Sequence, residues 1–317
     1  MTRIAVIGGC GFVGSHVVDA LVEKGHEIVV VDNFLLGKMS NIQDAMNKGS
    51  VKVYNEDARQ LTALHEIITT EKIETVVNLA MKCLPTSFVD PEGAYMAGVQ
   101  IAANLAYILR KEGYKRLVHF SSSEIYGSAL EVPMSEEHPT APTTPYGAGK
   151  LAADHLLLSY HNVFDLNISI LRPFNLVGPR QNWNMYAALI PQTVRKILNG
   201  ETPFIQWDGE QTRDWTYVKD VANLIPQLLD SDALVGKVVN VGQGKETSIN
   251  EVMRLVCKEM DYPFEKVQHL PMRAGDVRRH CADVSLAKKL LKYYPKTDFK
   301  EAVHLTVEWF KNNSKRC

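Results

Sequence analysis

The chain has 317 residues, which is enough for one large domain or two smaller ones. Its 35 lysines and arginines nearly balance its 36 aspartates and glutamates, so it offers no basic excess for nucleic acid or an anionic membrane. No apolar run approaches the length of a membrane span, and the five cysteines are scattered without a Cys-x-x-Cys pair. We therefore expect a cytoplasmic protein with free thiols, no bound metal, and no nucleic-acid or membrane partner.

The first residues predict a strand, a tight turn and a helix. Residues 3–7 (RIAVI) form a short apolar run that is typical of a buried parallel strand. Gly8, Gly11 and Gly14 follow at intervals of three and lead into the amphipathic stretch 15–26. Glycines at this spacing let the backbone turn sharply and approach a pyrophosphate, whose charge the helix N-terminus stabilises.

A second strand and an acidic residue complete this pattern. Residues 27–31 (EIVVV) predict the strand, and Asp32 follows it, eighteen residues after Gly14. A carboxylate at this position accepts hydrogen bonds from ribose hydroxyls and repels a 2′-phosphate, which favours NAD over NADP. Three glycines alone could be coincidence, but the strand, helix and acid together predict a dinucleotide site.

Strand-like and helical segments alternate through the first half of the chain. Apolar runs such as IAVI, TVVNLA and RLVHFSSS are separated by helical patterns, for example over 61–70 and 99–111. This alternation predicts an α/β fold with a doubly wound parallel sheet. After residue 174 the rhythm changes, so we expect a nucleotide-binding domain over 1–174 and a smaller α/β substrate-binding lobe over 175–317. Residues 238–242 contain another strand-like run that could rejoin the first sheet.

Three residues in the middle of the chain form a candidate catalytic group. Ser122 follows the apolar run RLVHF, so it is expected at the carboxyl end of a strand, where ligands bind in such folds. Tyr146 and Lys150 are four apart and would share one face of a helix that begins near Pro145. The lysine charge and a positive nicotinamide ring would both lower the pKa of the tyrosine towards working pH.

Tyr146 could then take a hydroxyl proton while hydride leaves the same carbon, and Ser122 would hold the oxygen. A Tyr-x-x-x-Lys pair alone could equally be a helix-surface pair. Its combination with the glycine turn and the serine-rich strand end favours catalysis.

At these residues the chain resembles the extended short-chain dehydrogenases/reductases, in particular the nucleotide-sugar epimerases and dehydratases. The resemblance runs nearly end to end and implies a Rossmann domain, an NAD cofactor and a nucleotide-diphosphate sugar as substrate. It implies that the cofactor is held by Gly8, Gly11, Phe12, Val13, Gly14, Asp32, Asn33, Asp57, Ala58, Leu79, Ala80, Tyr146 and Lys150.

Further motifs imply where the substrate binds. The segment LRPFNLVGPRQ resembles the family's link between its two lobes, and its Asn175 would contact the substrate diphosphate. In two other family motifs, Arg213 would bind a phosphate, and Arg273 and Arg278 would lie near the nucleotide. Ser123 would also contact the substrate. Guanidinium groups suit a diphosphate because they donate two parallel hydrogen bonds, although arginines of this kind could also form a solvated face.

The sequence around the catalytic serine bears on the type of reaction. Residues 122–127 (SSEIYG) resemble the pattern of sugar-nucleotide 4,6-dehydratases and UDP-glucuronate decarboxylases, and the following stretch looks most like UDP-N-acetylglucosamine 4,6-dehydratases. Oxidation at sugar C4 acidifies the C5 proton, and Glu124 could remove that proton and help expel the C6 hydroxyl as water. Glu124 could instead only orient a substrate hydroxyl or cap the following turn.

Three sites depart from the family pattern. The family has His-Leu-Ala-Ala after the fourth strand, whereas this chain has NLAMK, with Met81 and Lys82 close to where nicotinamide and sugar meet. Gly98 replaces a helical asparagine, and Ser123 replaces the aspartate of glucose-type dehydratases. These changes could indicate an unusual substrate or a reaction that stops at the 4-ketone.

The leading prediction is therefore an NAD-dependent 4,6-dehydratase of a nucleotide-activated sugar. The alternatives are a C4 epimerase, a net C4-dehydrogenase that releases the 4-keto sugar, and a non-catalytic NAD-sensing scaffold on the same fold. Relatives commonly dimerise through two helices per subunit, here those around 99–111 and 146–160, so a homo-oligomer is expected.

Overall fold

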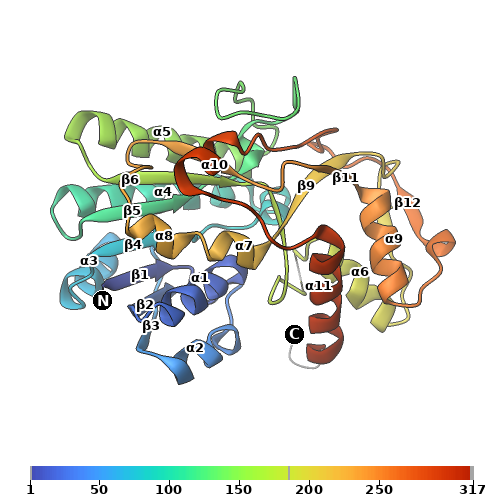
Figure 1. The fold of residues 1–317 in the computed structure, drawn as a ribbon, viewed down its shortest axis with the longest axis horizontal. Coiled ribbons are helices and arrows are strands. Elements are labelled where there is room, and N and C mark those ends of the chain that lie inside the picture. Colours follow the sequence, from blue (N-terminus) through green and yellow to red (C-terminus); the bar gives the residue numbers. More distant parts are fainter. Residues whose placement is uncertain (1, 185, 315–317) are drawn as a thin grey trace.

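A seven-stranded parallel sheet forms the centre of the computed structural model, which describes residues 2–184 and 186–314 (Figure 1). The strand order is β10-β6-β5-β4-β1-β2-β3, so the chain winds outwards from β1 in both directions. This confirms the predicted α/β class with a doubly wound parallel sheet. The strands are β1 (Arg3–Ile7), β2 (Glu27–Asp32), β3 (Val51–Asn55), β4 (Thr75–Asn78), β5 (Arg116–Phe120), β6 (Ile168–Pro173) and β10 (Val238–Val241).

Helices cover both faces of this sheet because each central strand is apolar on both sides. In β1, Ile4 and Val6 join one buried cluster, and the alternate residues Ala5 and Ile7 join another. The first cluster includes side chains of α1 (Phe12–Glu23), α2 (Gln43–Lys48), α7 (Val218–Ala222), α8 (Ile225–Leu229) and α10 (Ser285–Leu291). The second includes side chains of α3 (Leu61–Thr70), α4 (Pro91–Arg110) and α5 (Pro145–Phe164).

The part of the chain after residue 174 contributes both to the main sheet and to a separate cluster at the other end of the molecule. Residues 238–241 form β10, which pairs in parallel with β6 and so lies in the main sheet. The segments on both sides of β10 in the sequence build a third buried cluster with its own tryptophans, Trp183 and Trp215. The predicted division of the chain at residue 174 stays a prediction, since α7, α8 and α10 also pack on the main sheet.

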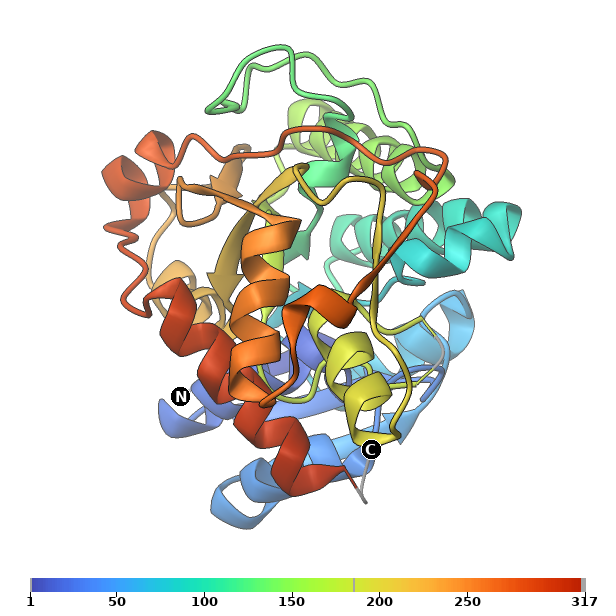
Figure 2. The same cartoon turned by 90° about the vertical axis from the view of Figure 1, so that its right-hand side faces the viewer.

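Two small sheets and three helices surround this third cluster. Figure 2 shows α6 (Leu189–Leu198), α9 (Ile249–Glu259) and α11 (Phe299–Asn313) facing the viewer at this end of the molecule. One sheet has the order β11-β9-β7 and the other pairs β12 with β8. Their strands are β7 (Asn175–Val177), β8 (Phe204–Gln206), β9 (Thr212–Tyr217), β11 (Glu246–Ser248) and β12 (Gln268–Leu270).

The two long helices beside the main sheet have clear start signals. The Asp90 carboxylate accepts a hydrogen bond from Gly93 N at 3.0 Å before α4, and Thr144 Oγ1 accepts one from Gly147 N at 3.1 Å before α5. Each cap is followed by a proline at the first helical position, where the missing N–H costs nothing. The helix predicted over 99–111 therefore begins earlier, at Pro91.

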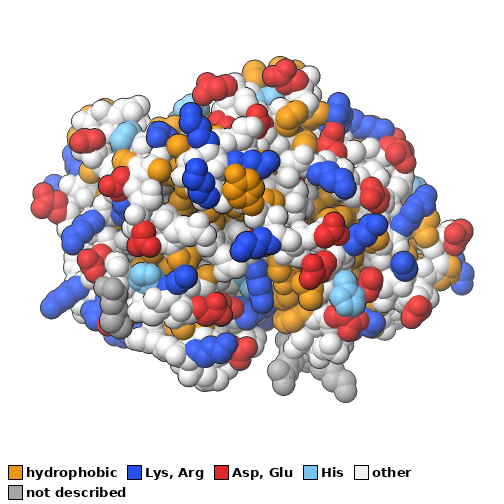
Figure 3. Space-filling model, viewed as in Figure 1, with side chains coloured by type: hydrophobic (Ala, Val, Ile, Leu, Met, Phe, Trp, Pro, Cys, Tyr) orange, Lys and Arg blue, Asp and Glu red, His pale blue; other side chains and the backbone are white. Residues whose placement is uncertain are grey.

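The outer surface mixes charges of both signs. On the face seen in Figure 3, Lys and Arg side chains alternate with Asp and Glu side chains and form no extended region of one sign. None of the helices in the described part of the chain combines the length and the apolar character that crossing a bilayer requires.

Candidate active site

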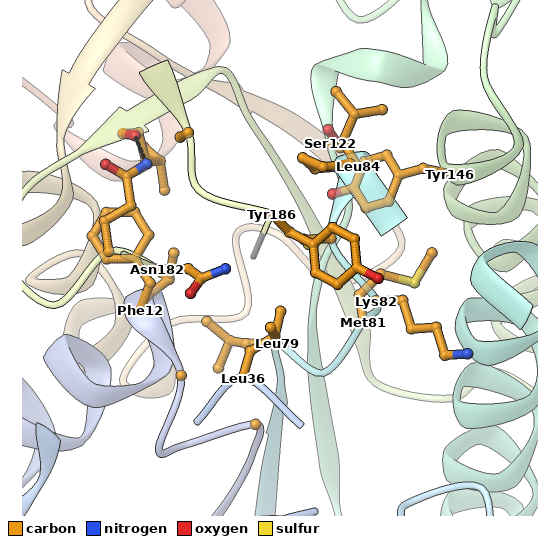
Figure 4. Close-up of a pocket in the computed structure, with 18 of the residues that line it drawn as sticks. Phe12, Leu36, Leu79, Met81, Lys82, Leu84, Ser122, Tyr146, Asn182 and Tyr186 are labelled. Carbon is orange, nitrogen blue, oxygen red and sulfur yellow. Dashed lines mark hydrogen bonds between the residues drawn. The ribbon is translucent and has the colours of Figure 1, made fainter. Parts of the chain in front are cut away.

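A cavity of about 980 Å³ lies at the carboxyl ends of the main parallel strands, between the main sheet and the smaller sheets (Figure 4). Parallel strands place their carboxyl ends at one edge, so residues far apart in sequence meet there. Seventeen predicted site residues line this cavity: Gly8, Gly11, Phe12, Val13, Gly14, Asp32, Asn33, Asp57, Ala58, Leu79, Ala80, Ser122, Tyr146, Lys150, Asn175, Arg213 and Arg273.

The glycine turn has the geometry that a dinucleotide requires. Gly8 has a φ of 79°, a region that side chains other than glycine rarely adopt. A Cβ atom at Gly14 would lie only 2.1 Å from the carbonyl oxygen of Gly8, so no other residue fits there. The turn leads directly into α1, whose N-terminal residues line the cavity. The backbone N–H groups of the first turn of a helix have no partner within the helix, so they suit a pyrophosphate.

The carboxylate after β2 is held firmly by the backbone. Asp32 is 7% exposed and accepts hydrogen bonds from Cys10 N and Phe34 N, both at 2.9 Å. Burial raises its pKa, and these two hydrogen bonds oppose the rise. A carboxylate offers about four acceptor positions, so two remain for ribose hydroxyls. Asp32 therefore keeps acceptor positions for the ribose hydroxyls of NAD, and its predicted role stays a prediction.

A second carboxylate lies after β3 at the same edge. Asp57 accepts a hydrogen bond from Asn33 Nδ2 at 3.2 Å and pairs with Arg59 at 2.7 Å. The hydrogen bond from Arg59 holds the pKa of Asp57 at about 2. Asp57 is therefore ionised at neutral pH and can accept hydrogen bonds at this end of the cavity.

Ser122, Tyr146 and Lys150 come together from two elements. Ser122 lies two residues after the end of β5, and its Oγ accepts a hydrogen bond from Glu124 N at 3.2 Å. Tyr146 and Lys150 lie in the first turns of α5, and Lys150 Nζ is 6.0 Å from the centre of the Tyr146 ring. The arrangement places a phenol, a hydroxyl and an ammonium at the carboxyl end of β5.

The electrostatics of this group differ from the prediction. Burial raises the pKa of Tyr146, and a hydrogen bond with Ser122 opposes the rise. Lys150 Nζ instead donates a hydrogen bond to the carbonyl oxygen of Phe120 at 2.6 Å, and burial lowers its own pKa to about 8. Without the cofactor, the pKa of Tyr146 is thus raised rather than lowered, and the ammonium of Lys150 faces a strand carbonyl rather than the phenol. The predicted lowering, which includes the charge of the nicotinamide ring, stays a prediction.

Two arginines line the other side of the cavity. Arg213 is 8% exposed and donates hydrogen bonds to the carbonyl oxygens of Thr212 and Val277 at 2.8 and 2.9 Å. Arg273 pairs with Asp276 at 2.7 Å, and Asp276 also lies 3.8 Å from Arg213. Asp276 thus holds both guanidinium groups in the cavity wall. The sequence analysis missed this role of Asp276, although the residue lies within the motif that carries Arg273.

Arg278 does not reach the cavity. Its Nη1 donates to both carboxylate oxygens of Asp208 at 2.8 Å, and its guanidinium lies 4.6 Å from the centre of the Trp207 ring. The side chain is 46% exposed. In the protein alone it therefore does not lie with the predicted substrate residues, because a surface carboxylate and an indole ring hold it elsewhere.

Ser123 and Glu124, the two residues after Ser122, are also not among the residues that line the cavity. Ser123 is buried, and both residues lie in the short 3₁₀ turn η3 (Ser123–Ile125). Burial raises the pKa of Glu124, and the charges of Arg213 and Arg273 oppose the rise. Glu124 is thus close to Tyr146 and to the arginines of the cavity wall, although it is not among the residues that line the cavity.

Met81 and Lys82 line the cavity and leave it open. Lys82 Nζ pairs with Asp90 at 2.5 Å, so its charge is directed to the start of α4. Tyr186, Asn182 and Cys83 also line the cavity but were not predicted, since no pattern in the sequence marks them. Among the described residues, no group of three or more His, Cys, Asp and Glu side chains could hold a metal ion.

Comparison with known proteins identifies the relatives of this chain. The family model described as GDP-mannose 4,6-dehydratase matches residues 5–306. The UDP-glucose 4-epimerase of Mycolicibacterium smegmatis is 34% identical over 316 residues, which cover 98% of this chain and 99% of that protein.

Solved structures of two enzymes are similar throughout. UDP-glucose 4-epimerase from Thermotoga maritima, solved with UDP-glucose, is 30% identical with a TM-score of 0.92, over 98% of this chain and 99% of that one. The dTDP-glucose 4,6-dehydratase from Streptomyces venezuelae, solved with NAD bound, is 26% identical with a TM-score of 0.93, over 99% and 98% of the two chains.

Proposed function

Because the chain belongs to the GDP-mannose 4,6-dehydratase family of extended short-chain dehydrogenases/reductases, we propose that it is an NAD-dependent enzyme that acts on C4 of a nucleotide-activated sugar. The observation that carries this proposal is the single cavity that joins the glycine turn, the Ser122–Tyr146–Lys150 group and the arginines Arg213 and Arg273. The glycine turn suits a dinucleotide, and the arginines suit the diphosphate of the sugar nucleotide.

The first step follows from the positions of three side chains. NAD, when bound, supplies the hydride acceptor and later the hydride donor. Tyr146 takes the proton of the C4 hydroxyl as general base, and Ser122 holds the same oxygen by a hydrogen bond. Lys150 adds positive charge at the base of the cavity, where its Nζ is fixed on the carbonyl oxygen of Phe120.

For the second step we propose 4,6-dehydration. The ketone at C4 makes the proton at C5 acidic, and Glu124 is the carboxylate next to the catalytic serine. Burial raises its pKa, which makes it a better base than an ordinary glutamate. Glu124 would pass the C5 proton to the C6 hydroxyl, which leaves as water. Return of the hydride to C6 and of a solvent proton to C5 would then give a 4-keto-6-deoxy sugar.

A second candidate is C4 epimerisation, in which the hydride returns to the other face of the same ketone. The position of Glu124 outside the cavity lining favours this candidate, since elimination needs a base that reaches C5. The relatives named UDP-glucose 4-epimerase, at 30–34% identity over almost the whole chain, also support it. Both candidates share the first step.

Mass spectrometry distinguishes the two outcomes. The purified protein with NAD is incubated in heavy water with UDP-glucose, UDP-N-acetylglucosamine, dTDP-glucose and GDP-mannose. Dehydration gives a product that has lost water and carries solvent deuterium at C5, and Glu124→Gln should reduce this loss strongly. An epimerase gives a product of unchanged mass, and a net dehydrogenase gives a product that lacks two hydrogens. Either result would contradict the dehydratase proposal while leaving C4 oxidation in place.

A further inference from the structure

Two departures from the family pattern touch each other in the structure. Met81 follows β4 and lines the cavity, and Gly98 lies inside α4. A Cβ atom at Gly98 would lie 2.9 Å from Met81 Sδ and 3.0 Å from Met81 Cε. Such distances are shorter than real Cβ contacts, so the end of the methionine side chain occupies the room that a side chain at position 98 would need.

The backbone gives no other reason for a glycine at this position. Gly98 lies in the interior of a regular helix and is not among the glycines with positive φ. Glycine in a helix interior is less favourable than alanine because it loses more backbone freedom. The next atom that a Cβ would meet is the carbonyl oxygen of Gly149 at 3.5 Å, an ordinary contact. Met81 is therefore the neighbour that a side chain at position 98 would displace, since the close atoms are the far end of a flexible side chain.

The contact bears directly on the reacting end of the cavity. In Figure 4 the Met81 side chain extends from the end of β4 towards α4, and Tyr186 is another residue that lines the same cavity. Ala97 and Ile101, which flank Gly98 on α4, also line the cavity. Met81 and Tyr146 line the same cavity, so a methionine displaced from Gly98 can move into the space that we assign to the sugar.

We propose that Met81 determines how large a sugar the cavity accepts, and that Gly98 keeps Met81 out of the sugar's place. This inference rests on the proposed binding of a nucleotide sugar in the cavity. A side chain at position 98 would push the thioether into the sugar's position, and removal of the thioether would widen it. Met81 is thus a specificity-determining residue, and its effect depends on the residue at position 98.

A double-mutant cycle in ligand affinity tests the proposal. Gly98→Ala, Met81→Ala and the double variant are titrated by calorimetry, in the presence of NAD, with UDP-, dTDP- and GDP-glucose and with the matching nucleoside diphosphates. We expect Gly98→Ala to weaken the best glucose nucleotide roughly tenfold, as overpacking does. The double variant should return to within about twofold of the wild type, since the clashing atoms are gone. Affinity for the nucleoside diphosphate should stay unchanged throughout.

Thermal unfolding of the same four proteins gives an independent measure. Gly98→Ala should raise the melting temperature in the Met81→Ala background, as expected for a helix interior, and should fail to raise it when Met81 is present. Met96→Ala, an exposed change on the same helix, is the control and should alter neither measurement.

Two results would overturn the proposal. One is an equal stabilisation by Gly98→Ala in both backgrounds, which would mean that Met81 does not occupy the space. The other is an equal loss of affinity for the glucose nucleotide and for its diphosphate, which would place the effect away from the sugar. Neither measurement needs turnover. If the protein proved inactive but the double-mutant cycle gave the expected affinities, the proposed reaction would be contradicted and the role of Met81 would stand.

Discussion

The two sides of the cavity are built in different ways. On one side, the glycine turn, Asp32 and Ser122 lie at or directly after the carboxyl ends of parallel strands, where the register of the sheet fixes them. On the other side, Arg213 is held by carbonyl oxygens and Arg273 by the carboxylate of Asp276. Topology positions the first set, and individual side-chain pairs position the second.

This difference has a functional meaning. A hydride transfer needs the base, the hydroxyl and the cofactor at fixed distances, and regular strands and a capped helix supply such rigidity. Recognition of a particular nucleotide or sugar needs residues that can change without disturbing the fold. The segment around Arg273, which lies outside the helices and strands, allows that, whereas Arg213 lies on β9. We therefore expect substitutions on the strand side to affect turnover and those on the arginine side to affect affinity.

The largest expected effect is that of Tyr146→Phe. The change removes the proposed base but keeps the aromatic ring in α5, so turnover of the accepted sugar nucleotide should fall by about 10²–10⁴-fold. Binding of NAD should persist, because the glycine turn and Asp32 are untouched. Steady-state kinetics and calorimetric titration with NAD measure the two properties.

Tyr160→Phe serves as the matched control, since Tyr160 lies on the same helix and outside the cavity lining. It should leave turnover within about twofold of the wild type, as surface changes usually do. Normal turnover by Tyr146→Phe would remove the basis of the catalytic assignment and would favour a protein that binds NAD without using it.

A smaller effect concerns the burial of Lys150. The pKa of this lysine is lowered from 10.5 to about 8, which corresponds to a cost on the order of 3 kcal/mol for keeping it charged inside the protein. Lys150→Met should therefore raise the free energy of unfolding at pH 7 while lowering turnover. Chemical denaturation at several pH values measures the stability difference.

The direction of the pH dependence follows from the two pKa values. Below pH 8 the lysine is charged in both the folded and the unfolded protein, so the full cost is present. Between pH 8 and 10.5 the folded protein releases its proton first, and the cost declines. The advantage of Lys150→Met should thus be largest below pH 8 and should shrink as the pH rises. The exposed change Lys258→Met should show no such trend, and a constant advantage at all pH values would contradict the explanation.

The sequence predicts the strand side of the cavity better than the arginine side. The main sheet, the glycine turn and the Ser122–Tyr146–Lys150 group follow from strand patterns and from i,i+4 spacing, which are local properties of the chain. The start of α4 at Pro91 was missed, although Asp90 is a standard capping residue. The apolar pattern is weak over the first turns of this helix, where glycine and alanine predominate.

Predictions that depend on tertiary pairing were less successful. Nothing in the sequence indicates that Arg278 stacks on Trp207 and pairs with Asp208, or that Lys150 faces the carbonyl oxygen of Phe120. The short turn after Ser122 likewise takes Ser123 and Glu124 out of the cavity wall, although their neighbour in the chain lies in it. Such details depend on contacts between distant segments, which periodicity does not encode.

The smallest expected effects compare two arginines that the motifs present as equivalent. Arg213→Gln removes a buried guanidinium from the cavity wall, so affinity for the accepted nucleoside diphosphate should fall by about 10–100-fold, the range for hydrogen bonds to charged groups. Arg278→Gln, the matched change, removes only an exposed pair with Asp208 and should alter affinity by less than about twofold. Calorimetry gives both affinities, and circular dichroism checks that each variant folds. Equal losses would mean that Arg278 leaves Asp208 and reaches the nucleotide once it is bound, so that both arginines belong to the same side of the cavity.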